Sequence, residues 1–163
     1  MKLKHLFILA LLLTLPLACS AEKPSKAVTT DAYTYSVPED WEVMDMPGTG
    51  IKVSKTKTGE ANINVVGQPF EGTLQDYVKA NVDQMEMIKV KKLSEGPFKT
   101  EDGLEGVKVV AENTMTGKTM RQTFYFFKGK GNTMFVVTCT AAKDIDSYTP
   151  VFDSAVKTFV PRQ

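Results

Sequence analysis

Two stretches in the second half of the chain carry large apolar side chains at consecutive positions, and this pattern limits the folds open to the chain. Residues 123–127 read Thr-Phe-Tyr-Phe-Phe, so a strand here presents Phe126 to one face of a sheet and Phe127 to the other. Residues 133–141 repeat the pattern. A sheet with one solvated face would have polar residues at every second position. Both faces therefore need cover, and the sequence predicts three layers.

Two segments have the apolar periodicity of an amphipathic helix, and we expect them to supply that cover. In residues 74–88 and again in residues 147–159, apolar side chains recur at helical spacing on one face. Thr73 is expected to cap the first helix, and either Asp146 or Thr149 the second. The apolar face of the first helix is expected to consist of Leu74, Tyr77, Val78, Val82, Met85 and Ile88.

Strand-like segments separated by Gly-containing turns occupy most of the remaining chain. Their connections have the length of hairpins, which favours antiparallel pairing. The expected fold class is α+β, a three-layer α/β/α sandwich with a central antiparallel sheet. The strands are expected at residues 33–37 (with a continuation at 41–44), 51–57, 61–66, 89–93, 106–113, 118–127 and 133–141.

The start of the chain has the order of a secretory signal peptide. Basic residues are followed by an apolar run from Leu6 to Leu15 and then by small residues. The run is too short to remain as a membrane-spanning helix. We therefore expect an exported protein.

Cys19 decides where the signal peptide is expected to be cut. Residues 15–19, Leu-Pro-Leu-Ala-Cys, resemble a bacterial lipobox, in which the cysteine is diacylated, carries palmitate-like chains and begins the mature protein. Lipidation at Cys19 predicts a signal peptide over residues 1–18 and a lipoprotein anchored to a membrane, facing the periplasm or the cell exterior. Ser20 would direct it to the outer membrane of a Gram-negative cell. The alternative is ordinary cleavage after Ala21, which discards Cys19.

A polar segment follows the signal peptide. It is composed mainly of Ser, Lys, Glu, Pro and Thr, which bury too little apolar surface to form a core. We expect a flexible tether over residues 19–31 and one folded domain over residues 32–163.

The histidine content restricts the chemistry that the exported chain can perform. His5 is the only histidine and lies in the signal peptide. The mature chain therefore lacks Ser-His and Cys-His catalysis, and it lacks the commonest ligand of zinc. We expect no catalytic residue, no cofactor-binding residue, no metal ligand and no enzymatic activity. A formal net charge of +1 gives no reason to expect a nucleic-acid partner.

Cys139 is the second of two cysteines. Alternation along the strand places it on the face shared by Phe135 and Val137. A reactive thiol needs a basic neighbour to stabilise the thiolate, and this strand has none. Cys139 is therefore interpreted as a small buried apolar residue.

Two Met-x-Met pairs offer thioether ligands for Cu(I). They are Met44 with Met46, and Met85 with Met87. The alternative places Met85 in the core and the other three methionines on the surface. This alternative is favoured, because the mature chain has no histidine and no dense run of methionines.

Aromatic and charged residues in two further places allow a functional and a structural interpretation each. For Trp41, which follows Glu39 and Asp40, the functional interpretation is that it lines a ligand pocket, and the structural one is that it closes the end of the core. For a group of four lysines, the functional interpretation is that they bind acidic lipid headgroups, and the structural one is that they protect the edge of a strand from pairing. These lysines are Lys79, Lys89, Lys91 and Lys92.

Three segments resemble the PsbP-like and DcrB-like superfamily. Residues 33–41 show its opening pattern of an aromatic strand, Pro, two residues and Trp. Residues 62–77 resemble the strand, loop and helix start that follow, and residues 152–159 are similar to its last helix. The resemblance implies a three-layer fold around an antiparallel sheet and a non-catalytic extracytoplasmic protein, as in DcrB-like lipoproteins. No photosystem-binding motif is recognisable.

These observations lead to a ranked expectation for function. The first hypothesis is a non-catalytic, membrane-tethered accessory or interaction protein with a protein partner in the cell envelope. The alternative is a small-molecule-binding module with a pocket between sheet and helix. An exposed apolar surface would favour the first, and a deep apolar pocket the second.

Overall fold

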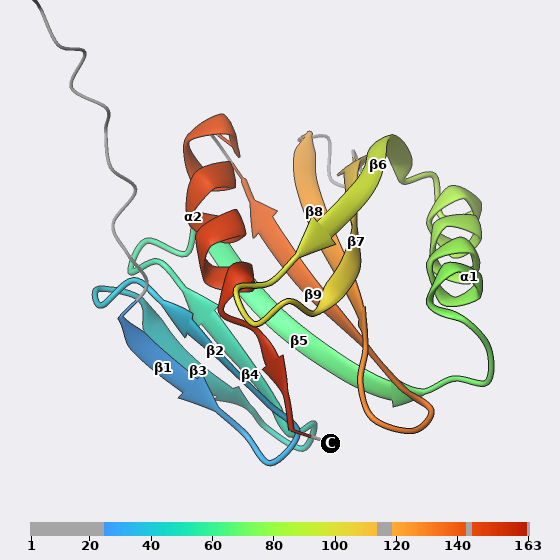
Figure 1. Ribbon diagram of the computed structural model, residues 1–163. Coiled ribbons are helices and arrows are strands. Elements are labelled where there is room, and N and C mark those ends of the chain that lie inside the picture. The colour runs from blue at the N-terminus through green and yellow to red at the C-terminus, as the bar shows by residue number, and fades with distance from the viewer. Residues whose placement is uncertain (1–24, 114–118, 143–144, 163) are drawn as a thin grey trace, which may run out of the picture.

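The computed structural model describes residues 25–113, 119–142 and 145–162 (Figure 1). The segment expected to be a signal peptide, Cys19 and residues 20–24 lie outside this part of the chain. The elements within it are β1 (Lys26–Thr29), β2 (Tyr33–Val37), β3 (Glu42–Met46), β4 (Ile51–Lys55), β5 (Ala61–Pro69), α1 (Leu74–Met87), β6 (Lys91–Lys99), β7 (Glu105–Asn113), β8 (Met120–Lys128), β9 (Thr133–Ala141), α2 (Ile145–Lys157) and β10 (Val160–Pro161).

The central layer is a seven-stranded sheet in the order β3-β4-β5-β9-β8-β7-β6, and every neighbouring pair is antiparallel. The two strands with apolar residues on both faces, β8 and β9, lie side by side inside it. The predicted antiparallel sheet is confirmed.

Each face of this sheet is covered by a helix, as the alternation in β8 and β9 predicted (Figure 1). Phe126 and Met134 belong to the apolar cluster that packs under α1. Phe127 and Phe135 point the other way and pack with Phe152 of α2. The three-layer α/β/α arrangement is therefore confirmed.

A second, three-stranded sheet, β1-β2-β10, shares the α2 side of the molecule (Figure 1). The expectation that the strand at residues 33–37 continues at residues 41–44 is wrong. Residues 42–46 form a separate strand, β3, which belongs to the larger sheet, whereas β2 belongs to the smaller one. The chain turns between the two strands, where the Trp41 amide donates to the Pro38 carbonyl at 3.1 Å. Proline stops β2 because it has no amide hydrogen for the ladder.

The tether expected over residues 19–31 is wrong for its last part. Residues 26–29 form β1, which pairs with β2 in register Val28↔Tyr35, and Val28 is buried. Ser25 is already held, since its amide donates to the Val37 carbonyl at 2.9 Å. The folded domain thus begins at least seven residues before residue 32. One buried side chain in a four-residue strand leaves too weak an apolar pattern to predict.

The helix α1 begins as predicted and ends slightly earlier. The Asp76 amide donates to Thr73 Oγ1 at 3.1 Å, and the Thr73 amide donates to Asp76 Oδ2 at 2.9 Å, which completes a capping box. Lys89 adopts a left-handed φ of 62°, and the chain turns away there. Ile88, expected on the buried face, is therefore exposed.

The helix α2 begins at Ile145, so Asp146 lies inside its first turn and neither Asp146 nor Thr149 is its N-cap. Its predicted apolar face is confirmed, with Phe152, Ala155, Val156 and the following Phe159 buried. In the described ranges, neither α1 nor α2 combines the length and apolar character needed to cross a bilayer.

Candidate functional site

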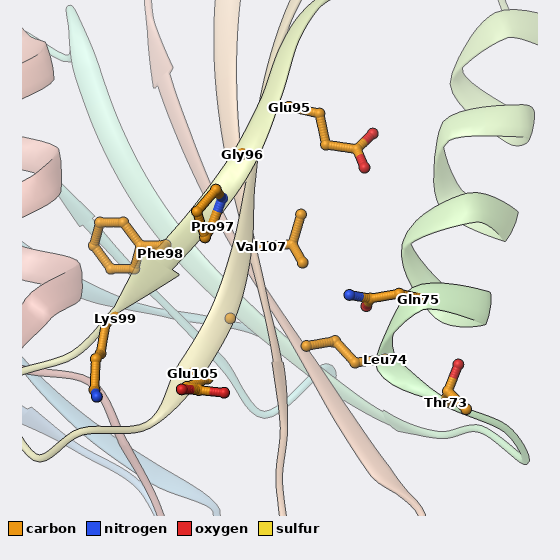
Figure 2. A pocket seen from close by; sticks show the side chains of 11 residues that line it. Thr73, Leu74, Gln75, Glu95, Gly96, Pro97, Phe98, Lys99, Glu105 and Val107 are labelled. Carbon is orange, nitrogen blue, oxygen red and sulfur yellow. The ribbon is translucent and has the colours of Figure 1, made fainter.

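A large hollow in the described surface lies between the first turn of α1 and the edge of the sheet. Its volume is about 870 Å³. Leu74 and Gln75 line it from α1, and Pro97 and Val107 line it from β6 and β7. Figure 2 shows the Gln75 amide and the Leu74 side chain pointing from the helix toward Val107.

A second hollow of about 300 Å³ extends the first along the helix. The two share Gln75, Glu95 and Val107, and the second adds Val78 and Val82 from the next turns of α1. Together they form one open channel, which we call the α1–β6 groove and define by Leu74, Gln75, Val78, Val82, Glu95, Pro97 and Val107.

The packing of α1 positions the helix wall of the groove. The Tyr77 ring contacts Phe126 of β8 edge-on at 5.8 Å, and its hydroxyl accepts from Gln68 Nε2 at 2.9 Å. Phe70 packs against the same tyrosine at 5.1 Å. These contacts hold the first turns of α1 over β8 and thereby set the helix wall of the groove opposite β6 and β7.

The strand wall is the last part of β6, where Phe98 acts as an anchor. Its ring lies 4.7 Å from that of Tyr125 and 6.2 Å from that of Phe127, on the α2 side of the sheet. Glu95 and Val107 point the opposite way, toward α1 (Figure 2). Phe98 therefore fixes the strand while its neighbours line the groove.

Charged side chains at the rim of the groove are paired with one another. Lys79 Nζ lies 2.6 Å from Asp83 Oδ2, and Lys92 Nζ lies 2.9 Å from Glu95 Oε2. Hydrogen bonds to these carboxylates raise the pKa of both lysines above the usual value. Two of the four lysines expected to form a basic cluster are thus ion-paired, and the rim has no uniform positive charge to attract acidic headgroups.

Cys139 lies where the strand alternation placed it. It is fully buried in the cluster with Phe135 and Val137. Burial raises its pKa well above the usual range, which disfavours the thiolate. The interpretation of Cys139 as a buried apolar residue is confirmed.

Trp41 closes the end of the core on the α2 side. It is buried and contacts Phe152 edge-on at 6.4 Å. The neighbouring carboxylates do not converge: Glu39 accepts from Ser25 Oγ at 3.1 Å, and Glu42 pairs with Lys55 at 3.1 Å. The structural interpretation of Trp41 is therefore confirmed.

The four methionines also follow the structural interpretation. Met85 is a buried residue of α1, whereas Met44, Met46 and Met87 are exposed. Within residues 25–113, 119–142 and 145–162, no three His, Cys, Asp or Glu side chains gather as a metal site requires.

A pocket between sheet and helix was expected only as the alternative, and the β6 residues that line the groove were missed, because the strand at residues 89–93 was expected to end before them. β6 runs on through Lys99. Pro97 lies within β6, and an edge strand tolerates proline where no ladder partner needs its amide. Phe98, one large apolar residue between polar neighbours, was the remaining signal.

Comparison with known proteins yields structural relatives only. No family model and no curated protein matches the sequence. The solution structure of cyanobacterial PsbP (CyanoP) from Synechocystis sp. PCC 6803 is similar with a TM-score of 0.60 at 14% identity, covering 92% of this chain and 98% of that one. The crystal structure of the Ran-binding protein Mog1p from Saccharomyces cerevisiae has a TM-score of 0.62 at 12% identity, covering 87% and 97%.

A crystal structure from Bacteroides thetaiotaomicron VPI-5482 is similar over 88% of this chain, with a TM-score of 0.59 and 13% identity, and this chain spans about half of it, 49%. These similarities concern the fold, and they agree with the resemblance of residues 33–41, 62–77 and 152–159 to the PsbP-like superfamily. The chain has the PsbP-like fold that CyanoP and Mog1p share.

Proposed function

We propose that this protein is a non-catalytic, membrane-tethered extracytoplasmic lipoprotein that acts as an accessory or interaction protein of an envelope complex. In this proposal it binds an apolar segment of a partner protein in the α1–β6 groove. The observation that carries it is the groove itself, an open channel between α1 and the edge strand β6 that has Leu74, Val78, Val82 and Val107 in its lining. Mog1p, described as Ran-binding, supports it as a protein-binding example of the same fold.

The shape and lining of the groove favour a polypeptide segment. Small-molecule sites enclose most of their ligand, whereas a groove between a helix and a sheet edge accepts side chains from an extended or helical chain. Leu74, Val78 and Val107 offer apolar contacts along its length. The paired charges at the rim add no strong field, so we expect apolar anchor residues to supply most of the affinity.

The alternative is a small-molecule ligand at the wider end of the groove. The hollow of about 870 Å³ beside Leu74 falls within the range of known ligand sites. Its lining also combines apolar residues with Gln75, Lys99 and Glu105.

The tether explains how such a protein would be presented to its partner. Five residues lie between Cys19 and Ser25, the first residue that the structure describes, and a fully extended chain would cover the distance from Cys19 to Ser25 in about 20 Å. A lipid on Cys19 would thus keep the domain close to the membrane surface. Partners that are themselves membrane-bound would meet it at a high effective concentration.

The test is affinity capture of the intact protein from detergent-solubilised membranes, with a substitution that fills the groove. Gln75→Arg adds bulk and charge at an exposed groove position, and arginine retains high helix propensity. Gln84→Arg is the matched control, since it is the same change at an exposed position of α1 outside the groove.

We expect a protein partner to be captured by the wild type and by Gln84→Arg, and to be lost with Gln75→Arg. Capture that is equal with both variants would exclude the groove as the docking site. Native mass spectrometry separates the two candidates: a small molecule retained by the wild type and lost only with Gln75→Arg would favour the ligand-binding alternative.

A further inference from the structure

The two edges of the seven-stranded sheet differ in how they are protected. Along β6, Lys91, Lys92 and Pro97 occupy the edge, and a register shift lies between Lys92 and Ser94. Lysine, proline and bulges are the features that keep edge strands from pairing with other chains. The opposite edge, β3, has no lysine, no proline and an unbroken register with β4.

The unprotected edge also carries exposed apolar side chains. All five residues of β3 are exposed. Val43, Met44 and Met46 are 36%, 51% and 45% exposed, so three of the five side chains on this strand are both apolar and exposed. An exposed, regular, apolar edge strand is a template for pairing with another strand.

The two acidic residues of β3 do not repel an approaching strand, because lysines of β4 neutralise them. Lys52 Nζ lies 2.7 Å from Asp45 Oδ1, and Lys55 Nζ lies 3.1 Å from Glu42 Oε2. Both pairs lie within the molecule and leave the outer edge of β3 without net charge.

Helix α1 does not cover this end of the sheet. Directly paired residues across the sheet point to the same face, and the pairs that start at Met44 lead through Val53, Asn64 and Thr138 to Phe124. Phe124 packs against the cluster under α1, so Met44 lies on the α1 face of the sheet. The apolar cluster under α1 takes members from β7, β8 and β9 and none from β3, β4 or β5. Met44 and Met46 therefore border a part of the sheet that the described elements leave open.

We infer that β3 pairs with β3 of a second copy of this chain, antiparallel and centred on Met44. In this register Glu42 lies opposite Met46, Val43 opposite Asp45, and Met44 opposite its own copy. All five residues are paired and no like charges face each other, which is the condition for a favourable cross-strand set.

Other registers are less favourable. Centring the pair on Asp45 places two carboxylates opposite each other, and centring it on Val43 leaves Asp45 and Met46 without partners from β3. A shift by one residue would bring side chains of opposite faces into register. The strand is thus self-complementary in one arrangement, which gives a closed two-fold dimer.

The contact is small, because each copy contributes one five-residue strand and its apolar neighbours. Stable dimers bury considerably more area, so the association is weak and concentration-dependent. It differs from the α1–β6 groove in location and in partner, since the groove lies beside β6 at the other edge of the sheet.

The first test is disulfide cross-linking in the exported full chain. A two-fold axis beside Met44 brings the thiols of two Met44→Cys chains within the span of a disulfide. Met87→Cys is the control, since Met87 is 83% exposed at the end of α1. Cys139 is fully buried and does not compete.

Under mild oxidation we expect Met44→Cys to give several-fold more covalent dimer than Met87→Cys. Equal yields would overturn the inference. So would a Met44→Cys product with the mass of one copy joined to a different protein, which would assign the edge to another partner.

Sedimentation velocity provides a second measurement without any introduced thiol. The wild type should shift toward dimer as concentration rises, and Met44→Lys should remove the shift because lysine protects an edge strand. Met87→Lys should leave it unchanged. A wild type that stays monomeric over the whole concentration series would overturn the inference.

Discussion

At the scale of single residues, the side chain of Asp153 joins three elements. Its Oδ1 accepts from Lys108 Nζ of β7 and from the Tyr125 hydroxyl of β8, each at 2.6 Å. The Lys108 ammonium also lies 5.4 Å from the centre of the Tyr125 ring. Burial raises the pKa of Tyr125, so its hydroxyl remains protonated and keeps donating to Asp153. One carboxylate on α2 therefore ties the helix to two strands.

We predict that Asp153→Asn lowers the free energy of unfolding by about 1–3 kcal/mol, because it weakens two charge-assisted hydrogen bonds in a partly buried place. Urea denaturation measures the change. Asp45→Asn is the control: that carboxylate side chain is 81% exposed, and its ion pair with Lys52 is expected to contribute no more than about 1 kcal/mol. Equal effects of the two variants would show that Asp153 is not the stronger link.

At the scale of elements, the position of α2 depends on its apolar stripe. Phe152 contacts Trp41 and Tyr148, and the following Phe159 stacks on Phe127 at 5.1 Å. All of these rings except that of Tyr148 are buried. The stripe brings the end of the chain, through β10, against β2.

Phe152→Ala should lower the free energy of unfolding by about 3–5 kcal/mol, since it removes a fully buried ring and leaves a cavity. Thermal unfolding of the purified protein measures it. The double variant Met46→Ala with Met87→Ala serves as the control and should change stability little, because both side chains are exposed. An unchanged melting temperature for Phe152→Ala would mean that α2 does not pack on the sheet.

At the scale of the whole molecule, the described fold begins at Ser25, beside the turn that leads into β3. Ser25 Oγ donates to Glu39 at 3.1 Å, and Lys26 Nζ donates to the Trp41 carbonyl at 2.5 Å. The first described residues thus lie at the same end of the domain as Trp41.

Replacing Cys19 by Ser should move the protein from the membrane fraction to the soluble fraction, because the proposed anchor is a lipid on that sulfur. Cell fractionation and immunoblotting measure the distribution. Cys139→Ser is the control and should leave the distribution unchanged, because its thiol is buried. An unmodified N-terminus at Glu22 in the wild type, found by mass spectrometry, would contradict the prediction.

The local pattern of the chain was sufficient for the layers of the fold. Phe126 and Phe127 point to opposite faces because neighbouring residues of any strand do so, and the helical repeats of α1 and α2 identify the two covers. Thr73 marked the start of α1 because an N-cap residue bonds to an amide in the first turn of its own helix. Each of these features depends on interactions between residues that are close in sequence.

Three features depended on contacts between distant segments. The strand β1 has a single buried residue, Val28, and exists through its pairing with β2. β6 reaches Lys99 because Phe98 packs against Tyr125. The groove lies where it does because Tyr77 docks on Phe126, which sets the first turns of α1 opposite β6 and β7. Periodicity shows which side of an element is buried, but the partner that buries it is chosen by the packing of the whole chain.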